Sequence, residues 1–147
     1  MREIGLVLRQ RFQLAGRRLR ARRGLVLLLV LEGIIGSVAG GAFAAHGLAA
    51  RLDESARSVF ETGARYHMYH ALAIGLSALA MRGEAQRRAR MAAILFLAGI
   101  ILFSGSLYLL ALTGITALGF VTPFGGLAFI AGWIFLALAG LKQPQAK

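Results

Sequence analysis

The 147-residue sequence contains no cysteine, and it has only 2 prolines, 3 histidines and 6 acidic residues. The absence of cysteine excludes disulfide scaffolds, thiolate metal sites, cysteine nucleophiles and CxxC redox pairs. The sequence also lacks a phosphate-binding loop, an HExxH zinc motif and a serine nucleophile elbow. We therefore expect no enzymatic activity and no cofactor.

Apolar residues and positive charge are abundant. Hydrophobic residues make up 58% of the chain, above the roughly 45–50% of a soluble domain, and this content excludes a disordered chain. Lys and Arg number 17 against 6 Asp and Glu, so the net charge is +11. Basic chains can bind nucleic acid, but here the basic blocks flank long apolar runs, which is typical of membrane proteins. We expect a single-domain membrane protein with no nucleic-acid partner.

Four apolar stretches predict an all-α protein, a four-helix transmembrane bundle with antiparallel, up-down topology. About 20 apolar residues cross the roughly 30 Å of membrane hydrocarbon. The second stretch is predominantly apolar only around 71–81, which is too short to cross, so its helix must begin near Thr62 to span. Pro123 after Thr122 predicts the start of the fourth helix, with Thr122 as its N-cap. The predicted spans are 24–45, 62–81, 91–112 and 123–141.

Basic residues predict the orientation of these spans. Eight arginines lie in residues 1–23, four lie in the loop 82–90, and two lysines lie in the tail 142–147. The segment 47–61 has no positive excess, and the loop 113–122 is uncharged. Under the positive-inside rule, the arm, the 82–90 loop and the tail lie in the cytoplasm, so both termini are cytoplasmic.

The arginine-rich arm, residues 1–23, is predicted to be an amphipathic helix at the cytoplasmic membrane surface. Its apolar residues recur every three or four positions, and arginines occupy the rest of the helix. Such a helix binds anionic lipid headgroups, and the alternative is docking on a partner protein. A cleaved signal peptide is disfavoured because the apolar run is too long. The candidate phosphate- or partner-binding residues are Arg17, Arg18, Arg20, Arg22 and Arg23.

Small residues at helical spacing predict close helix packing in the first and fourth spans. Such residues let the backbones of membrane helices approach closely. We expect this packing to lie within one chain rather than in a dimer seam, because four short-looped helices must first pack on each other. The candidate packing positions are Gly33, Gly36, Gly40, Gly41 and Gly132.

Polar residues inside the predicted spans form the candidate functional site. At 1.5 Å per residue, Glu32 and His70 each lie about 12 Å from opposite membrane edges, so roughly 6 Å separates their levels. Glu32 could therefore pair with His70, be protonated, or extend toward the inner headgroups. Trp133 lies about 15 Å deep, where its indole N–H needs an acceptor. The candidate acceptors are Ser104, Ser106 and Tyr108.

The histidines offer a further hypothesis. His67 and His70 share one helix face, and His46 ends the first span near the level of His67. Three converging histidines could bind a metal or haem, although histidines that bond neighbouring helices are commoner in membrane bundles. Tyr66 and Tyr69 fit an aromatic belt at the outer membrane interface.

Four sequence blocks resemble a known family. They are GAFAAHGL at 41–48, TGARYHMYHALA at 62–73, LFSGSLYLLALTG at 102–114 and TPFGGLAFIAGW at 122–133. In this order they resemble the family called domain of unknown function 423, which comprises small bacterial inner-membrane proteins and the eukaryotic transmembrane protein 256. The resemblance covers about residues 24–141.

The resemblance implies a four-helix, multi-pass protein of the bacterial inner (plasma) membrane without an established reaction. We expect a non-enzymatic structural or membrane-associated role, with anionic lipid headgroups as partners of the arm. One alternative is an accessory subunit of a larger respiratory or photosynthetic complex, which docks through its lipid-facing helices and the arm. A second is an oligomeric transporter, or a metal- or haem-binding protein, that uses Glu32 and the histidines.

Overall fold

The computed structural model describes residues 29–47 and 51–141 of the chain, and all of their regular elements are helical. The predicted all-α class is therefore confirmed. The predicted arm at 1–23, with its five candidate arginines, and the tail at 142–147 lie outside the described residues. The described helices are Leu29–Ala42, η1 (Phe43–Gly47), α2 (Glu54–Ala80), η2 (Gly83–Ala85), α3 (Gln86–Gly99), η3 (Ile100–Ser104), α4 (Gly105–Thr113), η4 (Thr116–Phe120) and α5 (Thr122–Gly140).

Helix α2 begins two turns before Thr62, where the apolar count placed the start of the span. Asp53 caps it, because the Asp53 carboxylate accepts a 2.7 Å hydrogen bond from the backbone N–H of Ala56. The 27 residues of α2 measure about 40 Å, so the helix is longer than the hydrocarbon layer. Apolar counting locates the part of a helix that suits lipid, whereas capping decides where the helix itself begins.

The third helical segment is continuous from Gly83 to Thr113, and η3 is a π-helical turn in its middle. It ends at Gly114, whose φ of 70° is a left-handed conformation that glycine adopts without strain. The last segment begins at Thr122, and Val121 rather than Thr122 occupies the cap position. The hydroxyl of Thr122 instead lies 2.8 Å from the Ser106 hydroxyl, which corrects the predicted capping role.

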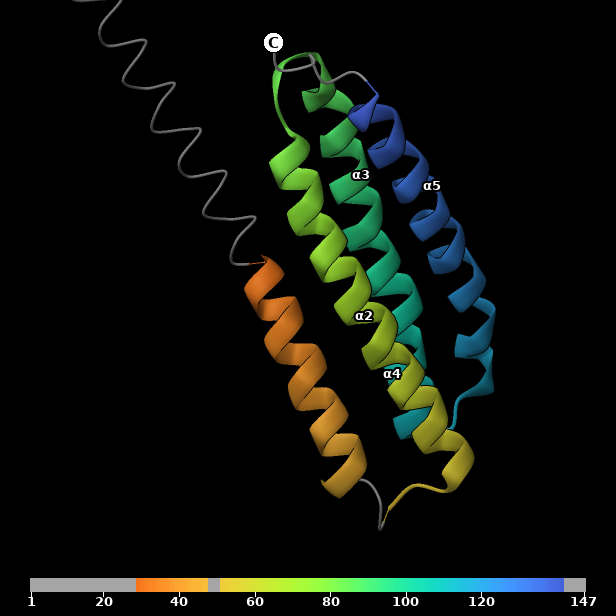
Figure 1. Ribbon diagram of the computed structural model, residues 1–147. Helices are drawn as coiled ribbons and strands as arrows, with labels where there is room; N and C mark the ends of the chain where they lie inside the picture. Colours follow the sequence, from red (N-terminus) through yellow and green to blue (C-terminus); the bar gives the residue numbers. More distant parts are fainter. Residues whose placement is uncertain (1–28, 48–50, 142–147) are drawn as a thin grey trace, which may run out of the picture.

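Successive helical segments, with Gly83–Thr113 counted as one, are antiparallel neighbours, as their short connections predict (Figure 1). Helix α2 contacts both α3 and α4, and α5 packs along α3. Helix Leu29–Ala42 lies on the outer side of α2, at the edge of the bundle (Figure 1). Helix α2 therefore lies between this first described helix and the remaining helices.

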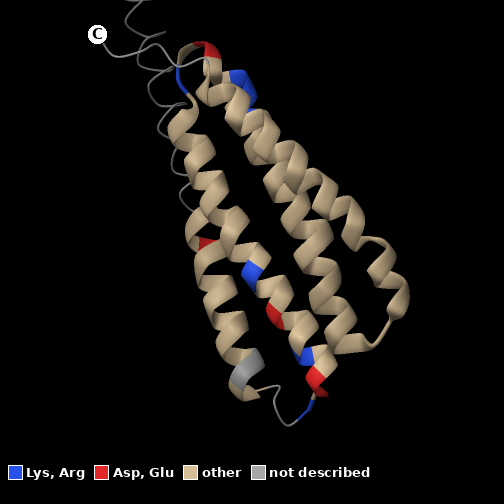
Figure 2. Ribbon diagram, turned by 45° about the vertical axis from the view of Figure 1, so that its right-hand side comes forward, with Lys and Arg blue, Asp and Glu red and all other residues tan. Residues whose placement is uncertain are grey.

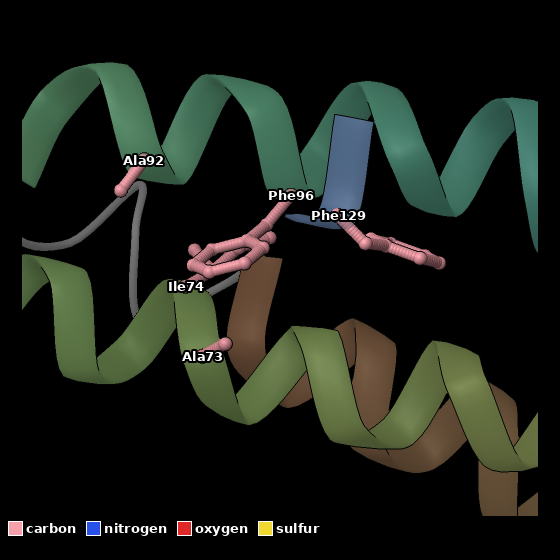
Figure 3. Close-up of a cluster of buried hydrophobic side chains, with 5 residues drawn as sticks. All are labelled: Ala73, Ile74, Ala92, Phe96 and Phe129. Atoms are coloured by element: carbon pink, nitrogen blue, oxygen red, sulfur yellow. The ribbon is translucent and has the colours of Figure 1, made fainter. Parts of the chain in front are cut away.

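The core lies where α2, α3 and α5 meet. Figure 3 shows its main cluster, in which the ring of Phe96 lies between two helices and is fully buried. Two of the five side chains are alanines, so the helices approach closely around the two aromatic rings and the one isoleucine. The cluster consists of Ala73, Ile74, Ala92, Phe96 and Phe129.

The outer faces of the bundle are apolar. The helical stretches Gly83–Thr113 and Thr116–Gly140 are long and apolar enough to cross a membrane. In the most apolar 18 residues of each, however, only 28% and 17% are buried. Charged residues are sparse on the helices and lie at the ends of the bundle, along part of α2 and at one acidic position in the first described helix (Figure 2). In a water-soluble bundle the apolar stripe of each helix faces the core, so exposed stripes of this kind suit contact with lipid.

Candidate functional site

His70, on α2, is held by α5 on one side and by its own helix on the other. Its Nδ1 lies 2.8 Å from the carbonyl oxygen of Tyr66, and its Nε2 accepts a 3.3 Å hydrogen bond from the indole N–H of Trp133. A carbonyl only accepts and an indole N–H only donates, so Nδ1 carries the proton and the ring is neutral. The ring of Phe129 stacks on His70 with its centroid 3.4 Å away. Both ring nitrogens of His70 are therefore occupied.

The acceptor of the Trp133 indole N–H lies on α2, and not on the third span as predicted. The candidates on the third span have other neighbours or none: Ser106 lies beside Thr122, and Tyr108 lies beside His67. The buried Ser104 hydroxyl has no hydrogen-bond partner among the described residues. The acceptor is His70 because α5 turns this side of its surface toward α2, which helix depth alone does not specify.

A second cluster joins helix Leu29–Ala42, α2 and α4. The Nδ1 atom of His67 lies 3.3 Å from the Tyr108 hydroxyl. A Cβ atom at Gly36 would lie 3.6 Å from a Glu32 carboxylate oxygen and 3.8 Å from the His67 ring, so these two side chains lie near each other at Gly36. Glu32 is thus beside His67. The pairing with His70, one of the alternatives that depth left open, is not formed, because both ring nitrogens of His70 have other partners. The reason is rotational, because His70 points toward α5 while His67 points toward the first described helix and α4.

The three histidines do not form a metal site in the part of the chain that the structure describes. No group of three His, Cys, Asp or Glu side chains lies close enough to hold a metal ion among residues 29–47 and 51–141. His46 is exposed in η1, away from the ring contacts of His70. The rings of His67 and His70 point to different helices, so sharing one helix face does not make them converge.

The two tyrosines assigned to the aromatic belt differ in their contacts. Tyr69 is half exposed. Tyr66 is 39% exposed, and its ring packs against Phe103 with centroids 4.8 Å apart. Tyr66 also supplies the carbonyl that fixes His70. Its position therefore combines exposure with support of the polar cluster.

The predicted packing glycines fall into two groups. A Cβ atom at Gly33 would overlap the side chain of Ala71, and one at Gly132 would lie 2.6 Å from Phe96. Gly36 and Gly40 have ordinary spacing of 3.6 Å and 3.7 Å to their nearest atoms. A Cβ atom at Gly41 would meet no described atom within 4 Å, so Gly41 is not a close packing position among the described residues.

The spacing pattern missed three further close contacts. Gly99 meets Phe129, Gly63 meets Tyr108, and Gly125 meets the backbone of Phe103. The adjacent Gly125 and Gly126 are visible in the sequence as a pair at a helix start, which is a signal for close approach. That pair alone does not tell which of the two glycines faces the neighbouring helix.

The sequence comparisons agree with the resemblance. The family described as "Protein of unknown function (DUF423)" matches residues 40–126, more than half of the chain. The chain belongs to this family. The UPF0382 membrane protein YwdK of Bacillus subtilis is 47% identical over 103 residues, which cover 69% of this chain and 84% of the relative. The UPF0382 inner membrane protein YgdD of Escherichia coli is 35% identical over 123 residues, covering 84% and 93%.

A UPF0382 membrane protein of Haemophilus influenzae is 43% identical over 118 residues, covering 80% of this chain and 94% of the relative. No solved structure matches the chain. The DUF423 match contains His67, His70 and Tyr108, whereas Glu32 and Trp133 lie outside it. The chain is therefore a membrane protein of a family whose function is unknown.

The hydrogen bond between Trp133 and His70 is expected to stabilise this DUF423 protein measurably. We predict a coupling free energy of about 0.6–1.7 kcal/mol in a double-mutant cycle of Trp133→Phe and His70→Leu, the range for side-chain bonds between membrane helices. Circular dichroism during unfolding in detergent measures it. The control cycle combines Trp133→Phe with Ser106→Ala, which share no contact, and should give no coupling. A value near zero for the first cycle would contradict the bond.

Proposed function

We propose that this DUF423 member is a four-span inner-membrane protein whose role is structural and not enzymatic. The observation that carries the proposal is the use of its intramembrane polar groups. Three hydrogen bonds between side chains of the described residues each join two different elements: α2 with α5, α2 with α4, and α4 with α5. Polar side chains that form hydrogen bonds with neighbouring helices hold a bundle together. The exposed apolar faces described above support lipid contact around that bundle.

Charged residues near the beginning of α2 are unfavourable within membrane hydrocarbon, so their position relative to the membrane edge matters. The predicted membrane segment of α2 starts at Thr62, and Arg65 lies about 4.5 Å further along the helix. An arginine at this depth can extend its side chain to the headgroups. The charges before Thr62 then lie outside the hydrocarbon. Only Gly83–Thr113 and Thr116–Gly140 are long and apolar enough to span by composition alone among the described residues, so the crossing by α2 is part of this proposal.

The orientation is testable with single cysteines, because the native chain has none. We expect Ala117→Cys, in the loop before α5, to react with a membrane-impermeant maleimide in intact spheroplasts. Arg82→Cys, in the loop before α3, should react only after permeabilisation, since the basic loop is predicted to be cytoplasmic. The reverse labelling pattern would overturn the orientation. Equal labelling of both sites in intact spheroplasts would overturn the span count.

A second candidate function is that of an accessory subunit in a larger membrane complex. Glu32 favours it, because this carboxylate is exposed between the exposed side chains Leu31 and Ile35. A charge in mid-helix costs about 2.5–3.5 kcal/mol on insertion scales, and a polar group of a partner would offset that cost. Native mass spectrometry after gentle extraction tests this candidate. A stoichiometric larger complex that Glu32→Gln weakens would support it, and a lone chain would favour the structural role.

The transporter and the metal- or haem-binding alternatives both require the histidines to bind a ligand. His70 uses both ring nitrogens inside the bundle, so it would have to break two hydrogen bonds to bind a ligand. His67 has one nitrogen beside Tyr108. A mass excess that matches a metal or haem in the same native spectra would support ligand binding by His46 or His67.

A further inference from the structure

Arg65 is an exposed cation within the predicted membrane segment of α2. No described residue forms an ion pair with it within 4.0 Å. One turn before it, Glu61 lies 4.0 Å from Arg57 in an i, i+4 pair. Residues four apart share one helix face, so Arg57, Glu61 and Arg65 form a row of alternating charge with a net charge of +1. Because guanidinium groups do not lose their proton, Arg65 needs an anionic partner at the edge of the membrane.

A groove runs beside this row, between helix Leu29–Ala42 and α2. Its volume is about 410 Å³, and both Glu61 and Arg65 line it. The rest of the lining is small or apolar, including Gly41, Ala42 and Ala64. A Cβ atom at Gly41 would meet no described atom within 4 Å, so there is open space beside the small residues of the groove. The groove thus combines a charged end with an apolar channel.

We propose that this groove binds one phospholipid with a primary amine headgroup, from the leaflet at the N-terminal end of α2. Arg65 holds the phosphate, Glu61 accepts a hydrogen bond from the ammonium group, and an acyl chain lies between helix Leu29–Ala42 and α2. The inference rests on the proposed four-span arrangement, because only that arrangement places Arg65 at headgroup level.

The chemistry of both groups fits this ligand. A guanidinium presents parallel N–H donors that match two phosphate oxygens. Side chains four residues apart on a helix are separated by about 5–6 Å at Cβ, which is comparable to the short ethanolamine link between phosphate and amine. A quaternary amine has no N–H to donate, so Glu61 would distinguish a primary amine from a choline group. The apolar channel accounts for a lipid and not for free phosphate.

The test uses the full chain in detergent micelles with defined lipids, and native mass spectrometry counts the lipids retained. Phosphatidylethanolamine should be retained in preference to phosphatidylcholine with the same acyl chains. Arg65→Gln should lower retention of both lipids by about tenfold, as expected for loss of a charge-assisted bond. Glu61→Gln should remove the preference between them. The matched control Arg90→Gln, at the other end of the bundle, should change neither result.

A second variant tests the apolar channel without touching the charges. Gly41→Leu fills the groove and should reduce retention of both lipids while the fold remains intact, because a Cβ atom at Gly41 would meet no described atom within 4 Å. Unchanged retention in both Arg65→Gln and Gly41→Leu would overturn the lipid site. Equal retention of the two lipids by the native chain would overturn the amine recognition. If cysteine labelling supports four spans while retention is unchanged, only the lipid site fails and the proposed topology stands.

Discussion

Replacing Gly125 with alanine is expected to destabilise the bundle by about 1–3 kcal/mol, the usual cost of overpacking a tight interface. A Cβ atom at this position would overlap the backbone nitrogen of Phe103 and lie 2.7 Å from its Cβ. Backbone atoms in the π-helical turn η3 cannot rotate away as a flexible side chain can. The first turn of α5 would therefore have to move off the third helical segment.

Gly126 provides a matched control on the next residue. A Cβ there would meet no described atom closer than 3.9 Å, from the ring of Phe103. Alanine is a better helix former than glycine by up to about 1 kcal/mol, so Gly126→Ala should be neutral or stabilising. Helix propensity alone would favour both changes, and only the interhelical contact gives them opposite signs.

The two variants are compared by thermal unfolding in detergent, followed by circular dichroism. The fluorescence of Trp133 gives an independent readout, because it is the only tryptophan in the chain and lies on the same helix. We expect a lower unfolding midpoint for Gly125→Ala and an unchanged or higher one for Gly126→Ala. Equal midpoints for the two variants would show that α5 does not approach η3 this closely.

The second large effect is expected at Gly33, where helix Leu29–Ala42 crosses α2. A Cβ at Gly33 would overlap the Cβ of Ala71, which is fully buried. Alanine has no rotatable side chain that could give way, so Gly33→Leu should separate the two helices. Gly41→Leu is the control on the same helix, because a side chain there enters open space.

Disulfide formation between Val30→Cys and Gly75→Cys reports this separation. The nearest Val30 methyl carbon lies 3.3 Å from the Cβ position of Gly75, which suits a short crosslink, and the native chain has no other thiol. Crosslinking should be efficient alone and with Gly41→Leu. Gly33→Leu should reduce it at least about fivefold, in line with 1 kcal/mol or more of overpacking. Equal crosslinking with Gly33→Leu and Gly41→Leu would contradict the predicted crossing.

Helix Leu29–Ala42 takes part in both the polar cluster and the proposed lipid groove. This helix supplies Glu32 to the cluster with His67, and it forms one wall of the groove beside Arg65. Gly33→Leu should therefore also weaken lipid retention, whereas Gly125→Ala acts on the opposite side of the bundle. Comparing the two variants separates an effect on the groove from a general loss of stability.

The sequence by itself determined the helical class, the membership in DUF423 and the position of each polar residue along its helix. These follow from local chemistry, because apolar spacing specifies a helix and the constant rise specifies depth along it. The position of Trp133 within an apolar stretch predicted an acceptor for its indole N–H inside the bundle, and His70 is that acceptor. Family membership was visible because its blocks are contiguous in the chain.

Only the tertiary structure decided which residues meet. The partner of Trp133 is His70, 63 positions away, and the histidine beside Glu32 is His67. Both outcomes depend on how each helix is rotated about its axis, and a rotation of one residue, about 100°, changes the neighbour without changing the depth. The same rotation makes Gly125 a tight contact and leaves Gly41 open. Rotation is set by the packing of whole helices, so residues far apart in the chain determine it together.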